Sequence, residues 1–165
     1  MLSWQMLMDL GASCEGLRWF QQAYPQGATV AEAWTNCPDA KWQIWYFCQV
    51  ATTEQKSAFA WRCAGQAFRF ASKRHPQLAK WADNITPKNW LEAKAAADFA
   101  FANPAAGAAA AAGAAAAAAA YAAYANPAAG AAADAAAYAT YANPAAAAGG
   151  ARKEQVQWCA EYLGL

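Results

Sequence analysis

Three Asn-Pro steps in an alanine-rich tract constrain the fold more than any other feature of this chain. The repeats read FANPAAG from residue 101, YANPAAG from 124 and YANPAAA from 141. Proline disfavours the helical conformation of the residue before it, whereas asparagine is a favoured N-cap and proline fits the first helical position. The pattern predicts helices over 87–102, 104–125, 127–142 and 144–163. Continuous helices kinked at each proline are the alternative.

The alanine-rich tract needs neighbouring helices to be stable. Alanine has the highest helix propensity but buries little surface, so isolated helices of this composition are marginal in water. Tyrosine pairs three residues apart add a heavier stripe, and tyrosine is enriched at protein interfaces. We expect either core packing or a protein-interaction face, which would also permit homo-oligomers, for Tyr121, Tyr124, Tyr138 and Tyr141.

Helix-capping patterns divide residues 1–92 into short helices. A hydroxyl or carboxylate side chain at the N-cap accepts hydrogen bonds from backbone amides that the first turn leaves unpaired. The longest of these helices begins after Thr52 and is limited by Pro76. The predicted N-caps are Ser13, Thr29 with Glu32 in a capping box, Thr52 with Gln55 in a second capping box, and Thr86 before Pro87.

The segment AKWQIWYFCQV at 40–50 has apolar side chains on every side, which predicts a buried helix. Nine Trp, seven Tyr and seven Phe can fill a core with few, large side chains. We therefore predict an all-α fold, a compact multi-helix bundle in which Trp-rich N-terminal helices pack on an Ala/Tyr-rich helical layer. The prediction is one domain over 1–165, with a Trp-rich segment over 1–92, an Ala-rich helical segment over 93–150 and a closing helix over 151–165.

Charge and cysteine usage exclude several classes of function. A net charge of +1 provides little attraction for nucleic acid, whose binding depends on phosphate neutralisation. The five cysteines are scattered and have no metal-ligand spacing, so we expect reduced, mostly buried thiols with neither disulfides nor a metal site. The N-terminal segment lacks a basic region followed by an apolar run, and alanine is too weakly hydrophobic to predict a membrane span. The sequence favours a cytoplasmic protein that binds neither membrane nor nucleic acid.

No motif of an enzyme or cofactor site stands out. The acidic side chains never form a close pair that could divide acid and base roles, and no phosphate-binding loop, dinucleotide fingerprint or HExxH motif occurs. His75 is the one histidine; after two basic residues and before Pro76 it suits a helix C-terminus better than a general base. We predict no catalytic residues and no cofactor.

Three segments and their order resemble the Imm-5-like immunity proteins. They are LGASCEGLRWF from residue 10, ATVAEAWTNCPDAKWQIWYF from 28 and AFAWRCAGQAF from 58, followed by an Ala/Tyr tract and a closing helix. The resemblance spans most of the chain. It implies an all-helical partner of a toxin, of a type that also occurs in bacteriophage genomes, and it brings no catalytic residue set.

We therefore expect a non-enzymatic binding protein that neutralises a toxin or defence effector by direct contact, with the four tyrosines as its interface. The first alternative is a protein that sequesters a nucleotide-derived signal, because arginines can hold phosphates and aromatic rings can stack a base. A solvated basic helix face beside core tryptophans explains the same pattern. A structural, self-assembling helical protein is a further alternative. The ligand-binding residues of the first alternative would be Trp42, Trp45, Tyr46, Arg62, Arg69, Lys73 and Arg74.

Overall fold

The computed structural model describes residues 1–73, 75–82, 84–102 and 148–165, and these ranges are helical without a β-strand. The all-α prediction is confirmed. An isolated antiparallel bridge between Leu2 and Ala28 ties the N-terminus to the start of the third helix. The helices are α1 (Trp4–Asp9), α2 (Cys14–Ala23), α3 (Val30–Asn36), α4 (Ala40–Val50), α5 (Thr53–Ala71), the 3-10 helix η1 (Pro76–Trp81), α6 (Trp90–Ala102) and α9 (Ala148–Leu163).

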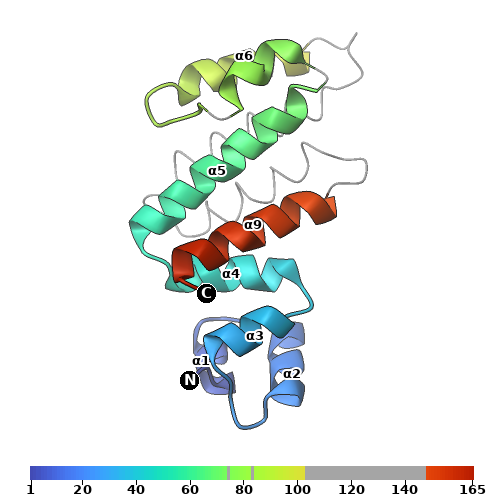
Figure 1. Cartoon of the computed structure of the whole chain (residues 1–165), viewed down its shortest axis with the longest axis vertical. Coiled ribbons are helices and arrows are strands. Elements are labelled where there is room, and N and C mark those ends of the chain that lie inside the picture. Colours follow the sequence, from blue (N-terminus) through green and yellow to red (C-terminus); the bar gives the residue numbers. More distant parts are fainter. Residues whose placement is uncertain (74, 83, 103–147) are drawn as a thin grey trace.

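The helices follow one another along the long axis of the molecule (Figure 1). α1, α2 and α3 form one end, α4 lies next to them, α5 and α9 occupy the middle, and α6 forms the other end. α9 packs against both α4 and α5, while η1 joins α5 to α6 through contacts with each. The closing helix therefore connects segments that are about a hundred residues away from it in the sequence.

Three of the predicted N-caps are confirmed. Ser13 Oγ accepts a hydrogen bond from the Gly16 amide at 3.2 Å. Thr29 begins α3 with a reciprocal capping box, in which its own amide donates to Glu32 Oε2 at 2.8 Å. Thr52 begins α5 in the same way with Gln55. These helix starts depend on side chains within one turn, so local sequence was sufficient to predict them.

Two helix starts differ from prediction. α1 was not predicted; Ser3 caps it by accepting from the Met6 amide at 3.2 Å. α6 begins at Trp90 and not at 87, because residues 87–89 form a turn. The Asn89 side chain closes that turn by accepting a hydrogen bond from the Thr86 amide at 2.8 Å.

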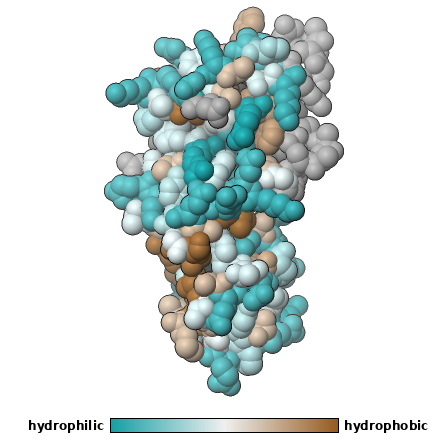
Figure 2. All heavy atoms as spheres, viewed as in Figure 1, coloured by the Kyte–Doolittle hydropathy of each residue, from teal (hydrophilic) through white to brown (hydrophobic). Residues whose placement is uncertain are grey.

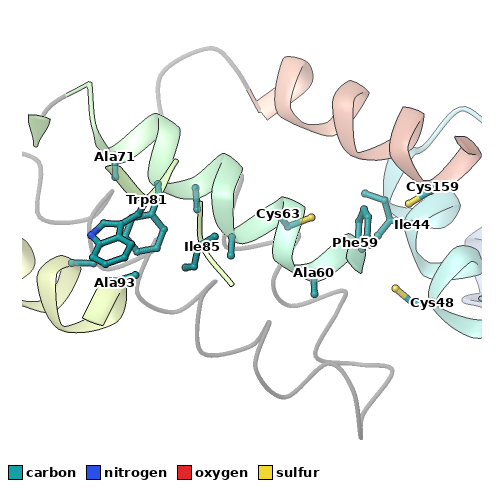
Figure 3. Close-up of a cluster of buried hydrophobic side chains, with 14 of the residues drawn as sticks. Ile44, Cys48, Phe59, Ala60, Cys63, Ala71, Trp81, Ile85, Ala93 and Cys159 are labelled. Carbon is teal, nitrogen blue, oxygen red and sulfur yellow. The ribbon is translucent and has the colours of Figure 1, made fainter. Parts of the chain in front are cut away.

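The larger core cluster lies where α4, α5, α6, η1 and α9 meet (Figure 3). Phe47, Phe59 and Phe68 are completely buried in it, and small side chains of α5 and α6 allow the close approach of neighbouring backbones. The Trp-rich helix α4 is buried on the side of Ile44 and Phe47 but only partly on its other side. A second, smaller cluster surrounds Phe20 at the other end of the molecule.

All five cysteines are free thiols. Cys48, Cys63 and Cys159 are buried in the larger cluster, whereas Cys14 is exposed and Cys37 is partly buried. Burial raises the pKa of the Cys63 and Cys159 thiols far above the ordinary value, so both stay protonated at neutral pH. The buried thiols thus act as small apolar side chains.

Helix α5 touches the segment after η1 at Gly65. A β-carbon at this position would lie 2.6 Å from the carbonyl oxygen of Ala82, so a side chain does not fit. This contact holds Ala82 close to α5, where Ile85 is also buried.

Several predicted features lie outside the described residues. They include the helices over 104–125 and 127–142, the choice between hairpins and kinks at the Asn-Pro steps, and the predicted interface of Tyr121, Tyr124, Tyr138 and Tyr141. Arg74 also lies outside them.

Candidate functional site

A cavity of about 560 Å³, lined largely by aromatic side chains, lies between α1, α2, α3 and α4. Its lining is mostly apolar, and this volume lies within the range of small-molecule sites in proteins. We call it the aromatic groove; its largest lining side chains are Trp19, Phe20, Trp34, Trp42, Trp45 and Tyr46.

Local sequence places these rings on facing walls. The Ser13 cap starts α2 so that Gly16, Trp19 and Phe20, at helical spacing, line one wall. The Trp42 ring from α4 lies 6.0 Å from the Trp19 ring between centroids. A β-carbon on Gly16 would lie 3.6 Å from Trp42, an ordinary contact, so α2 and α4 leave room for a small side chain at this point.

Polar groups lie at the rim of the aromatic groove. Asp39 Oδ1 accepts from the Lys41 amide at 2.8 Å and thereby caps α4. The Cys37 thiol donates to the Asp39 carbonyl at 3.4 Å, and burial raises the pKa of that thiol. Glu15 adds a second carboxylate, while Lys41 is the one cation among the residues that line the groove. This rim offers little to a phosphate.

A second cavity, of about 470 Å³, lies between α5, α9, Ala82 and Ile85. We call it the arginine cleft; its polar and aromatic lining consists of Trp61, Arg62, Gln66, Arg69, Glu154 and Trp158. Figure 2 shows that hydrophilic side chains cover the face over α5 and α9, whereas hydrophobic ones gather near the C-terminus of the chain.

Both arginines of the cleft contact α9. Arg62 Nη1 donates to Glu161 Oε2 at 2.9 Å, and its guanidinium lies over the Trp158 ring, 4.4 Å from the centroid. Arg69 Nη2 is 3.4 Å from Glu154 Oε2. The closing helix therefore uses its acidic and aromatic side chains to hold the basic side of α5.

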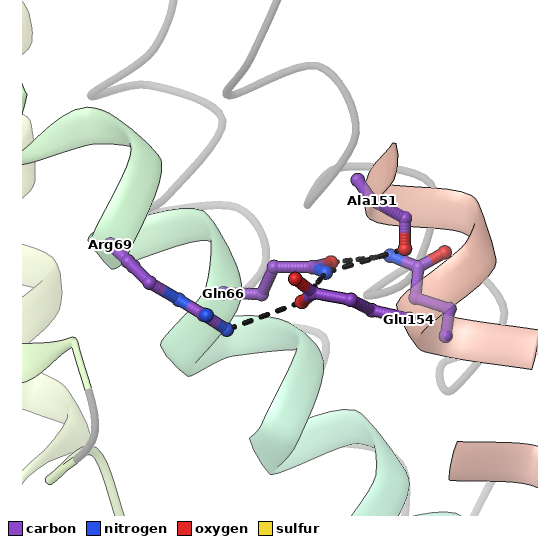
Figure 4. Close-up of polar contacts among 5 residues, drawn as sticks. Gln66, Arg69, Ala151 and Glu154 are labelled. Atoms are coloured by element: carbon purple, nitrogen blue, oxygen red, sulfur yellow. Dashed lines mark hydrogen bonds and ion pairs between the residues drawn. The ribbon is translucent and has the colours of Figure 1, made fainter. Parts of the chain in front are cut away.

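Beneath these ion pairs, two buried amides hold the helices together (Figure 4). Gln155 Nε2 donates to Gln66 Oε1 at 2.8 Å, and Gln66 Nε2 donates to Glu154 Oε2 at 2.8 Å and to the Ala151 carbonyl at 3.3 Å. Gln66 and Gln155 are 1% and 0% exposed, so their hydrogen bonds compensate the loss of water. The buried side of α9 runs along Ala151, Gln155 and Cys159.

The structure does not bring the two halves of the predicted ligand site into one cavity. Trp42, Trp45 and Tyr46 line the aromatic groove, whereas Arg62 and Arg69 line the arginine cleft. Lys73 lines neither cavity; its Nζ lies over the Phe70 ring, 5.3 Å from the centroid. Glu161, which pairs with Arg62, is 99 positions away in sequence, so helical spacing within α5 could not indicate this partner.

Sequence reasoning did not select Trp19, Trp61, Glu154 or Trp158, which line the two cavities. The Arg62 guanidinium lies over the Trp158 and Tyr162 rings of α9, 4.4 and 5.8 Å from their centroids. One signal was available: Trp61 and Arg62 share a helical face with Gln66 and Arg69, and an aromatic and a cation side by side are typical of anion sites.

His75 lies just after the C-terminal end of α5. Its amide donates to the Ala71 carbonyl at 2.9 Å, so the backbone, and not the imidazole, closes the end of α5. The imidazole is 4% exposed and lies at the start of η1. Its Nε2 has no hydrogen-bond partner within the described residues.

Comparison with family models, curated proteins and solved structures gives no match to this chain. Within the described ranges, no helix combines the length and apolar character needed to cross a membrane. The same ranges contain no cluster of three or more His, Cys, Asp or Glu side chains arranged to hold a metal ion.

Proposed function

We propose that this protein is a non-enzymatic binding protein that neutralises a protein toxin or defence effector by direct contact. The resemblance to the Imm-5-like immunity proteins suggests this class of partner, and the aromatic groove is the observation that carries the proposal. Tryptophan and tyrosine are the side chains that most often dominate binding energy at protein interfaces. The aromatic groove, with four tryptophans and Tyr46 in its mostly apolar lining, could accommodate an apolar side chain of a partner protein.

The rim of the groove supports a protein partner over an anionic small molecule. Glu15 and Asp39 outnumber Lys41, so a phosphate placed here would face net negative charge. The predicted nucleotide site of Trp42, Trp45 and Tyr46 with the α5 arginines has no support in this groove. Five free cysteines fit a reducing compartment, and we propose the cytoplasm as the place of action.

Native mass spectrometry of the full chain, isolated from cells that co-express candidate toxins, tests the proposal. We expect a retained toxin subunit and a matching loss of toxicity. In a purified pair, Trp42→Ala should weaken binding at least tenfold, because it removes a ring from the groove wall. Trp4→Ala is the matched control: Trp4 is 37% exposed and does not line the groove.

A second variant distinguishes the groove from the predicted tyrosine face. Replacing Tyr121, Tyr124, Tyr138 and Tyr141 together by alanine tests that face in the same assay. If only this variant loses binding, the interface is the tyrosine face and not the aromatic groove. The proposal would be contradicted if the protein forms a homo-oligomer without a bound toxin and every tested toxin stays active. This result would favour the self-assembling alternative.

A further inference from the structure

The arginine cleft presents a combination of groups that the proposed function does not use. α5 contributes one continuous face, in which Trp61, Arg62, Gln66 and Arg69 recur at helical spacing. α9 contributes Glu154 and Trp158, one turn apart, and Ile85 belongs to the third wall. A cleft of about 470 Å³ is large enough for a small organic ligand.

Arg69 is available to an anion at small cost. Its 3.4 Å contact with Glu154 is longer than the roughly 2.7–2.9 Å of a strong charge-assisted hydrogen bond. Both side chains are 44% exposed, and an exposed pair of this kind contributes about 1 kcal/mol or less. A phosphate group can accept two parallel hydrogen bonds from one guanidinium, so it would replace this contact by a stronger one.

Flat surfaces for an aromatic ring come from both helices. Trp61 belongs to α5 and Trp158 to α9, and the Arg62 guanidinium is already spread over Trp158 at 4.4 Å. The ion pair with Glu161 keeps Arg62 in this orientation. Stacking of a nucleobase on an aromatic side chain contributes about 1–3 kcal/mol, whichever base it is.

Glu154 can select among bases. Gln66 holds its Oε2 at 2.8 Å, and Gln66 is in turn held by Gln155, so the carboxylate rests on two buried amides. An ionised carboxylate only accepts hydrogen bonds. The pairing edge of guanine presents two adjacent N–H donors, whereas that of adenine presents one donor and one acceptor. A carboxylate in this position therefore favours guanine.

We propose that the arginine cleft binds a guanine nucleotide, with the base against the Trp61 ring, the Arg62 guanidinium plane and Glu154, and the phosphate on Arg69. The inference is independent of the aromatic groove, since the two cavities have no lining residue in common. It also differs from the nucleotide site expected from the sequence, because the aromatic partners of the arginines are Trp61 and Trp158.

Isothermal titration calorimetry of the full chain with GMP tests this inference, with AMP, guanosine and inorganic phosphate as comparison ligands. We expect GMP to bind at least tenfold more tightly than each of the other three, and to change tryptophan fluorescence. Arg69→Gln should weaken GMP at least tenfold and leave guanosine unchanged. Glu154→Gln retains an acceptor for Gln66 and should abolish the preference for GMP over AMP.

Lys73→Gln is the matched control, because it removes the same charge just after the C-terminal end of α5 and outside the cleft. This variant and Trp42→Ala should bind GMP like the unmodified chain. Absence of heat and of fluorescence change with millimolar GMP would overturn the inference, as would equal binding of GMP and AMP. GMP affinity that survives both Arg69→Gln and Glu154→Gln would also overturn it. None of these results bears on toxin binding, which uses the other cavity.

Discussion

Replacing either of two helical glycines by alanine should change the free energy of unfolding, and the two changes should have opposite signs. In Gly65→Ala the new β-carbon would lie 2.6 Å from the Ala82 carbonyl oxygen, so the two backbones must separate by about 0.8 Å to reach an ordinary 3.4 Å contact. Overpacking of this kind costs about 1–3 kcal/mol, and the better helix propensity of alanine returns up to about 1 kcal/mol. We expect a net loss of about 1–2 kcal/mol.

Gly16→Ala is the matched comparison, because its β-carbon would meet Ser13 Oγ at 3.4 Å and the Trp42 ring at 3.6 Å, both ordinary contacts. This variant should gain about 0.5 kcal/mol from helix propensity alone. Urea denaturation followed by circular dichroism measures both, and with a slope of about 2 kcal/mol per molar urea Gly65→Ala should shift the midpoint down by about 0.5–1 M. If Gly65→Ala proves as stable as the unmodified chain, the tight contact between α5 and Ala82 is wrong.

Two further predictions concern polar groups. Gln66→Leu should cost about 2–3 kcal/mol in urea denaturation, because it removes the donor to Glu154 and the acceptor for the buried Gln155 amide; a loss below about 0.5 kcal/mol would contradict this role. For Glu32, hydrogen bonds from the Thr29 amide and hydroxyl lower the carboxyl pKa below its ordinary value of 4.5. Because the folded-state pKa is lower than the unfolded-state pKa, the ionised carboxylate stabilises the folded protein above the unfolded-state pKa. This stabilisation is lost as the pH falls through the folded-state pKa. Thermal unfolding should therefore show the unmodified chain more stable than Glu32→Gln at pH 6, with a gap that narrows below pH 4.5; a gap independent of pH would refute the effect.

Local signals predicted much of the described fold. The caps at Ser13, Thr29 and Thr52 depend on partners three residues away, and the structure confirms each of them. The 40–50 helix was predicted from apolar side chains on every side of it, and its bounds agree with the structure; only the side of Ile44 and Phe47 is fully buried. α1 was missed because it has only six residues, too few for a periodic pattern to be evident.

The residues that line each candidate site could be predicted less well than the positions of the helices. Trp42, Trp45 and Tyr46 do line a cavity, yet their aromatic neighbour Trp19 belongs to another helix and was not selected. The partners of Arg62 and Arg69 on α9 are set by packing between helices distant in sequence. A helical pattern indicates which side chains share a face, but not which helix that face meets.

The position of α9 determines which charged side chains line each cavity. Gln55 Nε2 donates to the Tyr162 carbonyl at 2.7 Å, and the Tyr162 ring packs 6.0 Å from Phe47 of α4, so the end of α9 is held by both α4 and α5. In this position its carboxylates draw the arginines to the arginine cleft. The aromatic groove keeps the tryptophans of α2–α4 without those cations, and suits apolar side chains. Because the two cavities have no lining residue in common, the proposed binding of a nucleotide and the proposed binding of a protein should respond independently to single substitutions.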